Sequence, residues 1–297
     1  MSNAMEWLQF VLAPQMINGL SIGVAVVLMA LGLTIIFGLL DVINMAHGEF
    51  YAIGAYLAVA LLATGMSFWW ALVLTPLLMA VLGFVTERGL IQRVFHSKDR
   101  HTLTLLLTFG VAVVLEDALK IAFGANPLRL EAAISGATEM LGLFFPNYRL
   151  FVMLFGGALI AAVWLLVFRT SLGAIVRAAA YDRNMSASLG VPVQLVYAGT
   201  FAFGVALAGI AGVLLAPIYS VFPTMGKDFV LIAFSVVIIG GMGSIKGALL
   251  AGLLLTQVQS ISSLYISPVW SDPLLFGIMV LVLMWRPQGL FGKLGSA

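Results

Sequence analysis

Long stretches without a charged residue constrain this chain more than any other feature. Residues 16–40 and 150–168 contain no Asp, Glu, Lys or Arg. About 20 apolar residues suffice to cross the hydrocarbon core of a bilayer. Over the whole chain 62% of the residues are hydrophobic and only 9% are charged, whereas soluble domains carry about 25% charged residues. We therefore predict an integral membrane protein, and we exclude a soluble enzyme, a disordered chain and a nucleic-acid-binding protein.

Further apolar windows extend this pattern to an all-α polytopic membrane protein with eight or nine transmembrane helices. The stretch 50–87 is too long for one span, and we expect a turn at residues 64–67 to divide it. Lys246 alone separates the windows 229–245 and 247–271. The windows follow in the order 16–40, 50–87, 103–124, 150–168, 195–218, 229–245, 247–271 and 273–285.

The basic residues predict the orientation, because loops on the cytoplasmic side carry an excess of Lys and Arg. Loops 86–101 and 169–194 and the C-terminal tail contain nine basic residues: Arg88, Arg93, Lys98, Arg100, Arg169, Arg177, Arg183, Arg286 and Lys293. The loops on the opposite side contain three: Arg129, Arg149 and Lys227. We expect loops 86–101 and 169–194 and the C-terminus in the cytoplasm, and 125–148 as the largest external loop. Residues 1–10 lack a basic region, so no cleaved signal peptide is expected.

Small residues indicate where helices pack closely. Gly204, Ala208, Gly212 and Ala216 recur at four-residue spacing and form one stripe on a helix face. Such stripes let helix backbones approach in membranes. We predict a seam between helices of this chain, with a subunit interface as the alternative.

Three glycines within four residues predict a break in an otherwise apolar helix. Gly240, Gly241 and Gly243 occupy this position, and the backbone groups freed by a break cannot face lipid. Two interpretations are open: a discontinuous helix facing protein or a water-filled path, as in many transporters, or a tight turn at the cytoplasmic face.

The most polar interruption between two apolar windows is the segment 41–49. It contains Asp41, Asn44, His47 and Glu49. At membrane depth these groups would mark a solute path or gate, and at the cytoplasmic face they would form a solvated loop. The spacing of His47 and Glu49 places the side chains on opposite sides of a helix. With no cysteine, no His-Glu-x-x-His pattern and no nucleophile elbow in the chain, we expect neither a metal site nor catalytic residues.

Two further local patterns carry predictions. Glu116 and Lys120, four residues apart on a helix, are expected to form an ion pair nearer the external surface than the midplane. In the cytoplasmic loop, Asp182 is a good N-cap, and Gly190 suits the position after a helix end. Between them, Met185 and Leu189 form an exposed apolar strip. This strip suits a groove on another protein, or an interfacial helix against lipid headgroups.

Four stretches, in this order, resemble the LivH-like permease subunits of ABC importers for branched-chain amino acids. Residues 44–49, NMAHGE, resemble the family's Asn-apolar-Ala-His-Gly-Glu signature. Residues 177–192 are similar to its coupling-helix loop, and 240–248 to its glycine-rich signature. Residues 286–292, RPQGLFG, resemble its Arg-Pro-x-Gly-apolar-apolar-Gly ending. The chain departs from the family at Lys246, where proline is common, and at Asp182, where glutamate is frequent.

The resemblance implies the ABC importer permease fold, with a single transmembrane domain over residues 1–297 in a bacterial inner membrane. It implies a LivM-like second permease, two cytoplasmic ATPases that bind ATP and Mg, and a periplasmic solute-binding protein. The solutes would be branched-chain amino acids or related small polar molecules. Because the chain lacks the Gly-x-x-x-x-Gly-Lys-Ser/Thr loop, it is not expected to bind nucleotide itself. The implied ATPase-coupling residues are Arg177, Asp182, Asn184, Met185, Ala187, Leu189 and Gly190.

In this interpretation Asn44, His47 and Glu49 support the solute path or its gate. Three other classes of protein are alternatives: an ion-coupled secondary transporter that uses acidic residues within its spans, an intramembrane enzyme that uses His47 and Glu49, and a scaffolding membrane protein.

Overall fold

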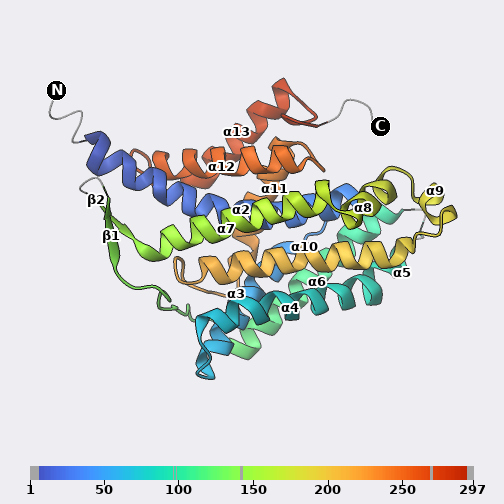
Figure 1. Ribbon diagram of the computed structural model, residues 1–297, viewed down its shortest axis with the longest axis horizontal. Helices are drawn as coiled ribbons and strands as arrows, with labels where there is room; N and C mark the ends of the chain where they lie inside the picture. Colours follow the sequence, from blue (N-terminus) through green and yellow to red (C-terminus); the bar gives the residue numbers. More distant parts are fainter. Residues whose placement is uncertain (1–6, 96, 98, 141–142, 268–269, 293–297) are drawn as a thin grey trace.

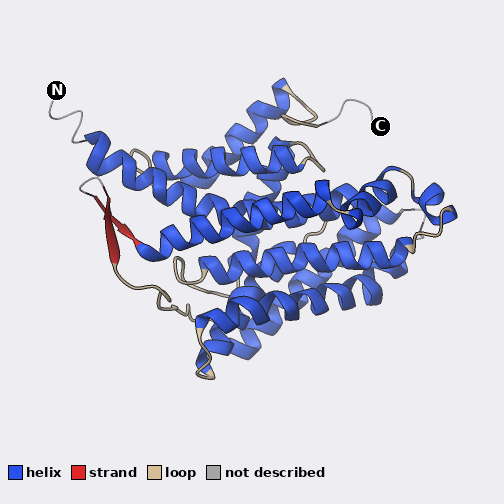
Figure 2. Cartoon of the chain, viewed as in Figure 1, coloured by secondary structure: helices blue, strands red, loops and turns tan. Residues whose placement is uncertain are grey.

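The computed structural model describes residues 7–95, 97, 99–140, 143–267 and 270–292, and nearly all of its regular structure is helical (Figures 1 and 2). The helices in chain order are the π-helical turn Leu8–Leu12, α2 (Ala13–Leu40), α3 (His47–Ala63), α4 (Phe68–Thr86), the π-helical turn Glu87–Ile91, α5 (Gln92–Val94), α6 (Arg100–Phe123), α7 (Asn147–Arg169), α8 (Ser171–Tyr181), α9 (Arg183–Ser188), α10 (Val193–Leu215), α11 (Met225–Gly240), α12 (Ile245–Ser262) and α13 (Ser271–Trp285). An antiparallel hairpin of β1 (Ala137–Met140) and β2 (Leu143–Pro146) precedes α7.

The long helices form a bundle whose connections gather at two opposite ends (Figure 1). One end, called here the hairpin end, carries β1, β2 and the turn at residues 64–67. The other, called here the α9 end, carries α8 and α9 and the connection from α5 to α6. Among the described residues, six helices are long and apolar enough to cross a membrane, and α3 and part of α13 are shorter apolar helices.

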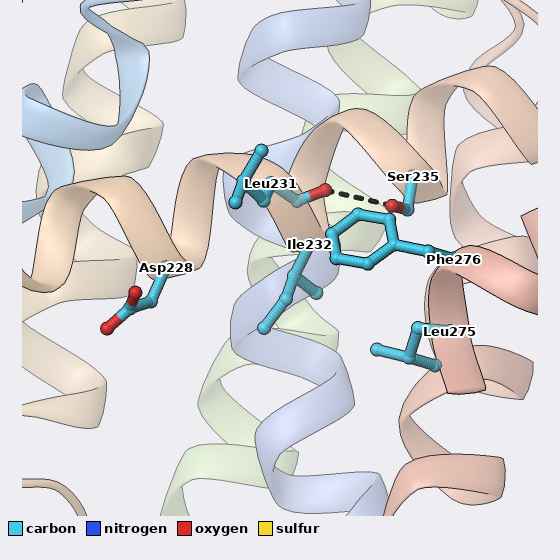
Figure 3. Close-up of a pocket in the computed structure, with 6 residues that line it drawn as sticks. All are labelled: Asp228, Leu231, Ile232, Ser235, Leu275 and Phe276. Carbon is cyan, nitrogen blue, oxygen red and sulfur yellow. Dashed lines mark hydrogen bonds between the residues drawn. The ribbon is translucent and has the colours of Figure 1, made fainter. Parts of the chain in front are cut away.

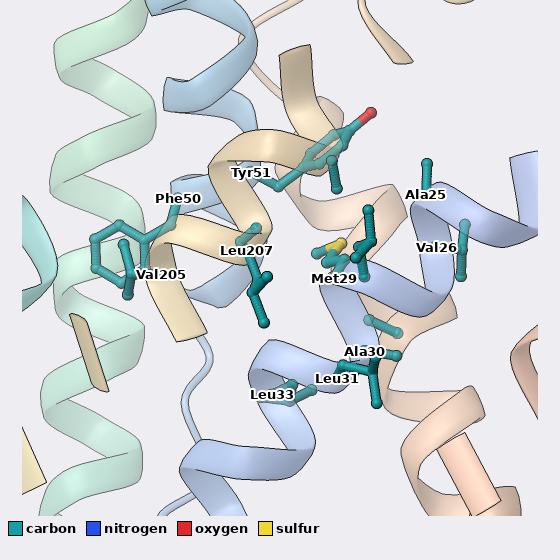
Figure 4. Packing of buried hydrophobic residues seen from close by; sticks show 14 of the residues in the cluster. Ala25, Val26, Met29, Ala30, Leu31, Leu33, Phe50, Tyr51, Val205 and Leu207 are labelled. Carbon is teal, nitrogen blue, oxygen red and sulfur yellow. The ribbon is translucent and has the colours of Figure 1, made fainter. Parts of the chain in front are cut away.

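The centre of the bundle is built on α2 and α10. Most of α2 is buried, including Leu28, Met29 and Leu31, and α10 packs against α2, α3 and α4. Figure 4 shows part of this buried cluster, with Met29 and Leu33 of α2, Phe50 and Tyr51 of α3, and Val205 and Leu207 of α10. In the peripheral helices α4, α6 and α7 only 22–33% of each span is buried, as expected of surfaces that lipid or another membrane subunit covers.

The expected division of residues 50–87 is confirmed. Helix α3 ends at Ala63, α4 begins at Phe68, and Gly65 between them has a φ of 85°, a conformation that suits glycine. The expected cytoplasmic loop 86–101 is partly wrong, because the helix continues to Val94 through a π-helical turn. Glu87, which appeared to end the span, is buried in that turn, so the charge lies against protein and does not stop the helix.

Two other boundaries differ from the expected windows. Lys246 does not separate two spans but lies in the first turn of α12, because the helix break comes earlier at residues 241–244. Helix α11 begins at Met225, so Lys227 and Asp228 are part of the helix.

The hairpin within the external loop 125–148 was not expected, because residues 137–146 show no clear alternation of polar and apolar side chains.

Candidate functional site

The polar segment 41–49 begins at the α9 end of the bundle and returns into the interior. Asp41 ends α2 in the left-handed region, with a φ of 53°, and its carboxylate lies 3.3 Å from the guanidinium of Arg100. The next helix begins only at His47, whose Nε2 donates a hydrogen bond of 3.0 Å to the carbonyl oxygen of Met29. Met29 lies 11 residues before Leu40 in α2, about 16 Å back along the helix axis. Helix α3 therefore starts inside the bundle.

Helix α6 supplies hydrogen bonds that the extended backbone lacks. The amide of Met45 donates to Thr108 Oγ1 over 3.2 Å, and the Thr108 hydroxyl lies 3.3 Å from the carbonyl oxygen of Ile43. Asn44 Oδ1 accepts from the amide of Ala46 over 3.1 Å. Irregular backbone at membrane depth must find such partners within the protein, so Thr108 and Asn44 stabilise the inward path of the chain.

The three polar residues of this segment that the sequence suggested as path or gate residues are all buried. Asn44 and His47 are 0% exposed and Glu49 is 2% exposed. Each has one side-chain atom without a hydrogen-bond partner among the described residues: Asn44 Nδ2, His47 Nδ1 and Glu49 Oε2. Of the two locations that the sequence left open, these side chains occupy the deep one, and only Asp41 lies at the surface. His47 faces α2 and Glu49 faces α11, so the two do not converge.

A glycine makes room for the Glu49 carboxylate. A Cβ atom on Gly226 of α11 would lie 2.5–2.7 Å from the carboxylate atoms of Glu49, closer than van der Waals contact allows. The backbone of Gly226 also packs directly on Gly48. The start of α3 and the start of α11 therefore touch at Glu49.

Nearby, an ion-pair cluster joins α6 to α11. The predicted pair of Glu116 and Lys120 is confirmed, with Nζ and Oε1 2.7 Å apart. Lys227 adds a second ion pair to the other carboxylate oxygen at 2.6 Å. Glu116 is buried, and two lysines offset the cost of removing its charge from water. Sequence reasoning missed Lys227, because its spacing from Glu116 in the chain carries no signal.

The glycine-rich break lies at the α9 end and is covered by the C-terminal segment. Gly241 and Gly243 have φ values of 98° and 78°. The amide of Leu290 donates to the carbonyl oxygen of Ile239 over 2.8 Å, and that of Phe291 to Gly240 over 3.1 Å. These bonds satisfy carbonyl groups that the end of α11 leaves free. The break is a tight turn packed against protein, with Gly243 beside Gly38 at the end of α2.

Helix α9 has the caps that the sequence predicts at both ends. Asp182 Oδ1 accepts from the amide of Met185 over 2.9 Å. Gly190 has a φ of 86°, and the amides of Gly190 and Val191 donate to the carbonyls of Ala187 and Ser186. This pair of bonds is the Schellman motif. The apolar strip is open to solvent, because Met185 is 63% and Leu189 75% exposed, and Asn184 and Ala187 beside it are exposed as well.

Aromatic rings hold the α8–α9 region against the bundle. The guanidinium of Arg183 lies 4.9 Å from the ring centre of Phe95 and 5.5 Å from that of Tyr197. Arg100 lies 5.5 Å from the Phe95 ring as well. Arg177 of α8 donates a hydrogen bond to the carbonyl of Val167. Cation–π contacts of this kind stabilise by about 0.5–2 kcal/mol. Phe95 and Tyr197 were not singled out from the sequence, where they are two aromatic residues among many.

The small-residue stripe of α10 lies inside the chain. Added Cβ atoms would overlap the Gly32 backbone and Ile36 at Gly204, and the Tyr51 carbonyl at Gly212. All four residues of the stripe, Gly204, Ala208, Gly212 and Ala216, are buried. The stripe is therefore a seam with α2 and α3.

One small cavity lies between α11 and α13. Its lining comprises Asp228, Leu231, Ile232 and Ser235 of α11 and Leu275 and Phe276 of α13. Figure 3 shows Ile232 and Ser235 beside Leu275 and Phe276, with Asp228 farther along α11 and the Ser235 hydroxyl bonded to the carbonyl oxygen of Leu231 at 2.9 Å. The volume of the cavity is about 40 Å³, enough for a water molecule or two and too small for an amino acid.

These features define a class of protein. A bundle of apolar helices, with a helix that starts deep inside it and a capped helix exposed at one end, is a multi-pass membrane protein of the transporter type. The chain belongs to the family described as branched-chain amino acid transport system / permease component, whose model matches residues 15–283.

Individual relatives agree with this assignment. The chain is 31% identical to the high-affinity branched-chain amino acid transport system permease protein LivH of Salmonella typhimurium, over 94% of this chain and 95% of the relative. It is 29% identical to LivM of Escherichia coli, over 89% of this chain and 67% of the relative. The solved structure of PsaBC from Streptococcus pneumoniae in complex with Fab shares the fold, with a TM-score of 0.52, 14% identity and coverage of 97% and 96% of the two chains.

Proposed function

We propose that this chain is one permease subunit of an ATP-driven importer that carries branched-chain amino acids or related small polar solutes across a bacterial inner membrane. The relatives named above, LivH and LivM, support the solute class. Similarity to both suggests a pathway built from two related permeases. ATP and Mg would be bound by two separate ATPases, and a periplasmic binding protein would deliver the solute.

The observation that carries the proposal is the exposed strip of α9. Met185 and Leu189 are large apolar side chains, and the caps at Asp182 and Gly190 hold their helix in a fixed shape. A rigid amphipathic helix with an unpartnered apolar face fits a groove on another protein. We assign that groove to the ATPase. Pro192, two residues after Gly190, leads into α10, which packs on α2, α3 and α4, so movement of α9 would reach the core of the bundle.

We assign Asn44, His47 and Glu49 to the path or its gate. Their unpartnered polar atoms support this role, because buried polar groups without partners are rare and costly unless a function needs them. The helix start at His47 gives the segment a hinge between the extended backbone and α3.

The test replaces the apolar strip by charges. Met185→Glu together with Leu189→Glu should prevent co-purification of the ATPases and abolish ATP-dependent leucine uptake in proteoliposomes. Phe144→Glu is the matched control, because this residue is 72% exposed on the hairpin at the opposite end. The control should keep ATPase co-purification. Normal assembly and uptake by the double variant would contradict the coupling role.

A second function has one observation in its favour. The buried Glu49 oxygen without a hydrogen bond could bind a coupling ion in a secondary transporter. Leucine uptake by the purified chain alone under an ion gradient, without ATPases, would support the ion-coupled secondary transporter.

A further inference from the structure

The last two turns of α12 are unusually polar for a helix in an apolar bundle. Thr256, Ser260 and Ser263 are spaced by four and three residues, so they share one helix face. Thr256 and Ser260 are 2% and 7% exposed. Polar side chains on a membrane helix face protein, water or solute, because lipid offers them no hydrogen bonds.

This face lines a cavity toward the hairpin end. The cavity has a volume of about 180 Å³. Besides Thr256, Ser260 and the C-cap residue Ser263, it is lined by Gln259 of α12, Ile22 of α2, Tyr219 and Ser271. It is several times larger than the cavity between α11 and α13. Six of its seven lining residues carry a hydroxyl or an amide, and none carries a charge. A small hydrogen-bonding solute fits this space, whereas a drug-sized ligand needs about 300 Å³ or more.

The hydrogen bonds within the wall determine what the cavity offers a solute. A hydroxyl has one donor hydrogen and two acceptor lone pairs. Thr256 donates to the carbonyl of Gly252 over 2.8 Å, Ser260 to that of Gln15 over 2.7 Å, and Ser263 to that of Ser260 over 2.7 Å. Their hydrogens are thus used within the protein, and their oxygens present lone pairs. At these three positions the wall presents acceptors, which favour a solute group that only donates.

An ammonium group has three donors and no acceptor. We propose that this cavity is a binding site for the ammonium end of a small α-amino acid near the external mouth of the transporter, held by the oxygens of Thr256, Ser260 and Ser263. This inference rests on the proposed function, because the cavity lies at the external mouth only if the hairpin end of the importer faces outward. It goes beyond that function by naming the residues and the solute group.

The chain contains no cysteine, which allows a direct test. Ser263→Cys places a single thiol on the cavity wall. Ser262→Cys is the matched control, one residue away and outside the lining. The labelling rate with a water-soluble thiol reagent is measured in the assembled complex, without ATP, in the presence of millimolar L-leucine or of 4-methylpentanoate, which is leucine without its ammonium group.

L-Leucine should slow labelling of Ser263→Cys at least threefold, and 4-methylpentanoate should not. Neither compound should change the rate at Ser262→Cys. Equal effects of leucine at both positions, or no effect at Ser263→Cys, would overturn the proposal. Equal protection by both compounds would also overturn it, because the site would then not recognise the ammonium group.

A second variant covers the case in which the thiol disturbs the site. Thr256→Val keeps the side-chain shape and removes the acceptor oxygen. Loss of one hydrogen bond to a charged group corresponds to about a tenfold change or more in binding, so KM for leucine should rise about tenfold with little change in kcat. An unchanged KM would count against the site. Failure of ATP-dependent uptake in the unmodified complex would contradict the proposed function. The labelling experiment needs no ATP, so it tests the cavity independently of transport.

Discussion

At the scale of single residues, the packing of this protein depends on places where two backbones touch. Gly212 of α10 lies against the backbone of Tyr51 and Ala55 in α3, and Gly54 of α3 lies against Gly209. Close approach of this kind strengthens dispersion contacts between helices, which drive association where the hydrophobic effect is absent. The spacing of the stripe indicated which face of α10 is small. It could not indicate that α2 and α3 are its partners, because that depends on the whole bundle.

Gly212→Ala should therefore destabilise the protein, because the new methyl group overlaps the Tyr51 carbonyl and the α10–α3 seam has to open. Overpacking of this size costs about 1–3 kcal/mol. Gly199→Ala in the same helix is the matched control, since nothing lies within 4 Å of its added Cβ, and it should be neutral or slightly stabilising. The SDS concentration at half-unfolding in detergent measures both. Equal midpoints for the two variants would contradict tight backbone packing between α10 and α3 at Gly212.

At the scale of elements, the sequence predicted where helices stop better than where the chain goes next. The turn at 64–67 and the break at 241–244 follow from glycines that occupy positive φ. The inward path of residues 41–46 could not be predicted, because its hydrogen bonds come from Thr108 and its endpoint from Met29, both remote in sequence. The same limit applies to Lys227, which completes the Glu116 cluster from another helix.

The C-terminal segment 286–292 shows how one element completes another. Its amides at Leu290 and Phe291 bond to the end of α11, and Gly289, with a φ of 78°, packs on the backbone of Gly241. The sequence predicted the glycine-rich break and the glycine-containing tail separately. Their contact explains why both need glycine, because neither backbone leaves room for a side chain.

Gly289→Ala should release this tail from the break. The added Cβ would lie 2.6 Å from Gly241 Cα and from the carbonyl oxygen of Ile238, so the amides of Leu290 and Phe291 lose their partners. Their hydrogen exchange, followed by mass spectrometry, should accelerate at least tenfold, which corresponds to about 1.4 kcal/mol. Gly277→Ala in α13 has open space around its Cβ and should leave the exchange unchanged. Protection retained in Gly289→Ala would show that the tail tolerates a side chain there.

At the scale of the whole molecule, the basic residues separate in space as they do in the sequence. Chain order and helix direction place Arg88, Arg93, Arg100, Arg169, Arg177, Arg183, Lys246 and Arg286 toward the α9 end, and Lys120, Arg129, Arg149 and Lys227 toward the hairpin end (Figure 1). Lys98 and Lys293, which the sequence also predicts to be cytoplasmic, lie outside the described residues. Because cytoplasmic loops carry an excess of Lys and Arg, we expect α9 and the C-terminal segment in the cytoplasm.

This orientation predicts opposite reactivity for two introduced thiols. Phe144→Cys on the hairpin and Tyr181→Cys on α8 replace side chains that are 72% and 94% exposed, so both thiols are accessible to reagent from their own side. In intact spheroplasts a membrane-impermeant thiol reagent should label Phe144→Cys, and it should label Tyr181→Cys only after lysis. The unmodified chain has no cysteine and supplies the blank. The reverse labelling pattern would indicate the opposite orientation of the protein in the membrane. It would place α9 on the side where no ATP is available, so the ATPase-coupling role of Met185 and Leu189 would be contradicted together with the orientation.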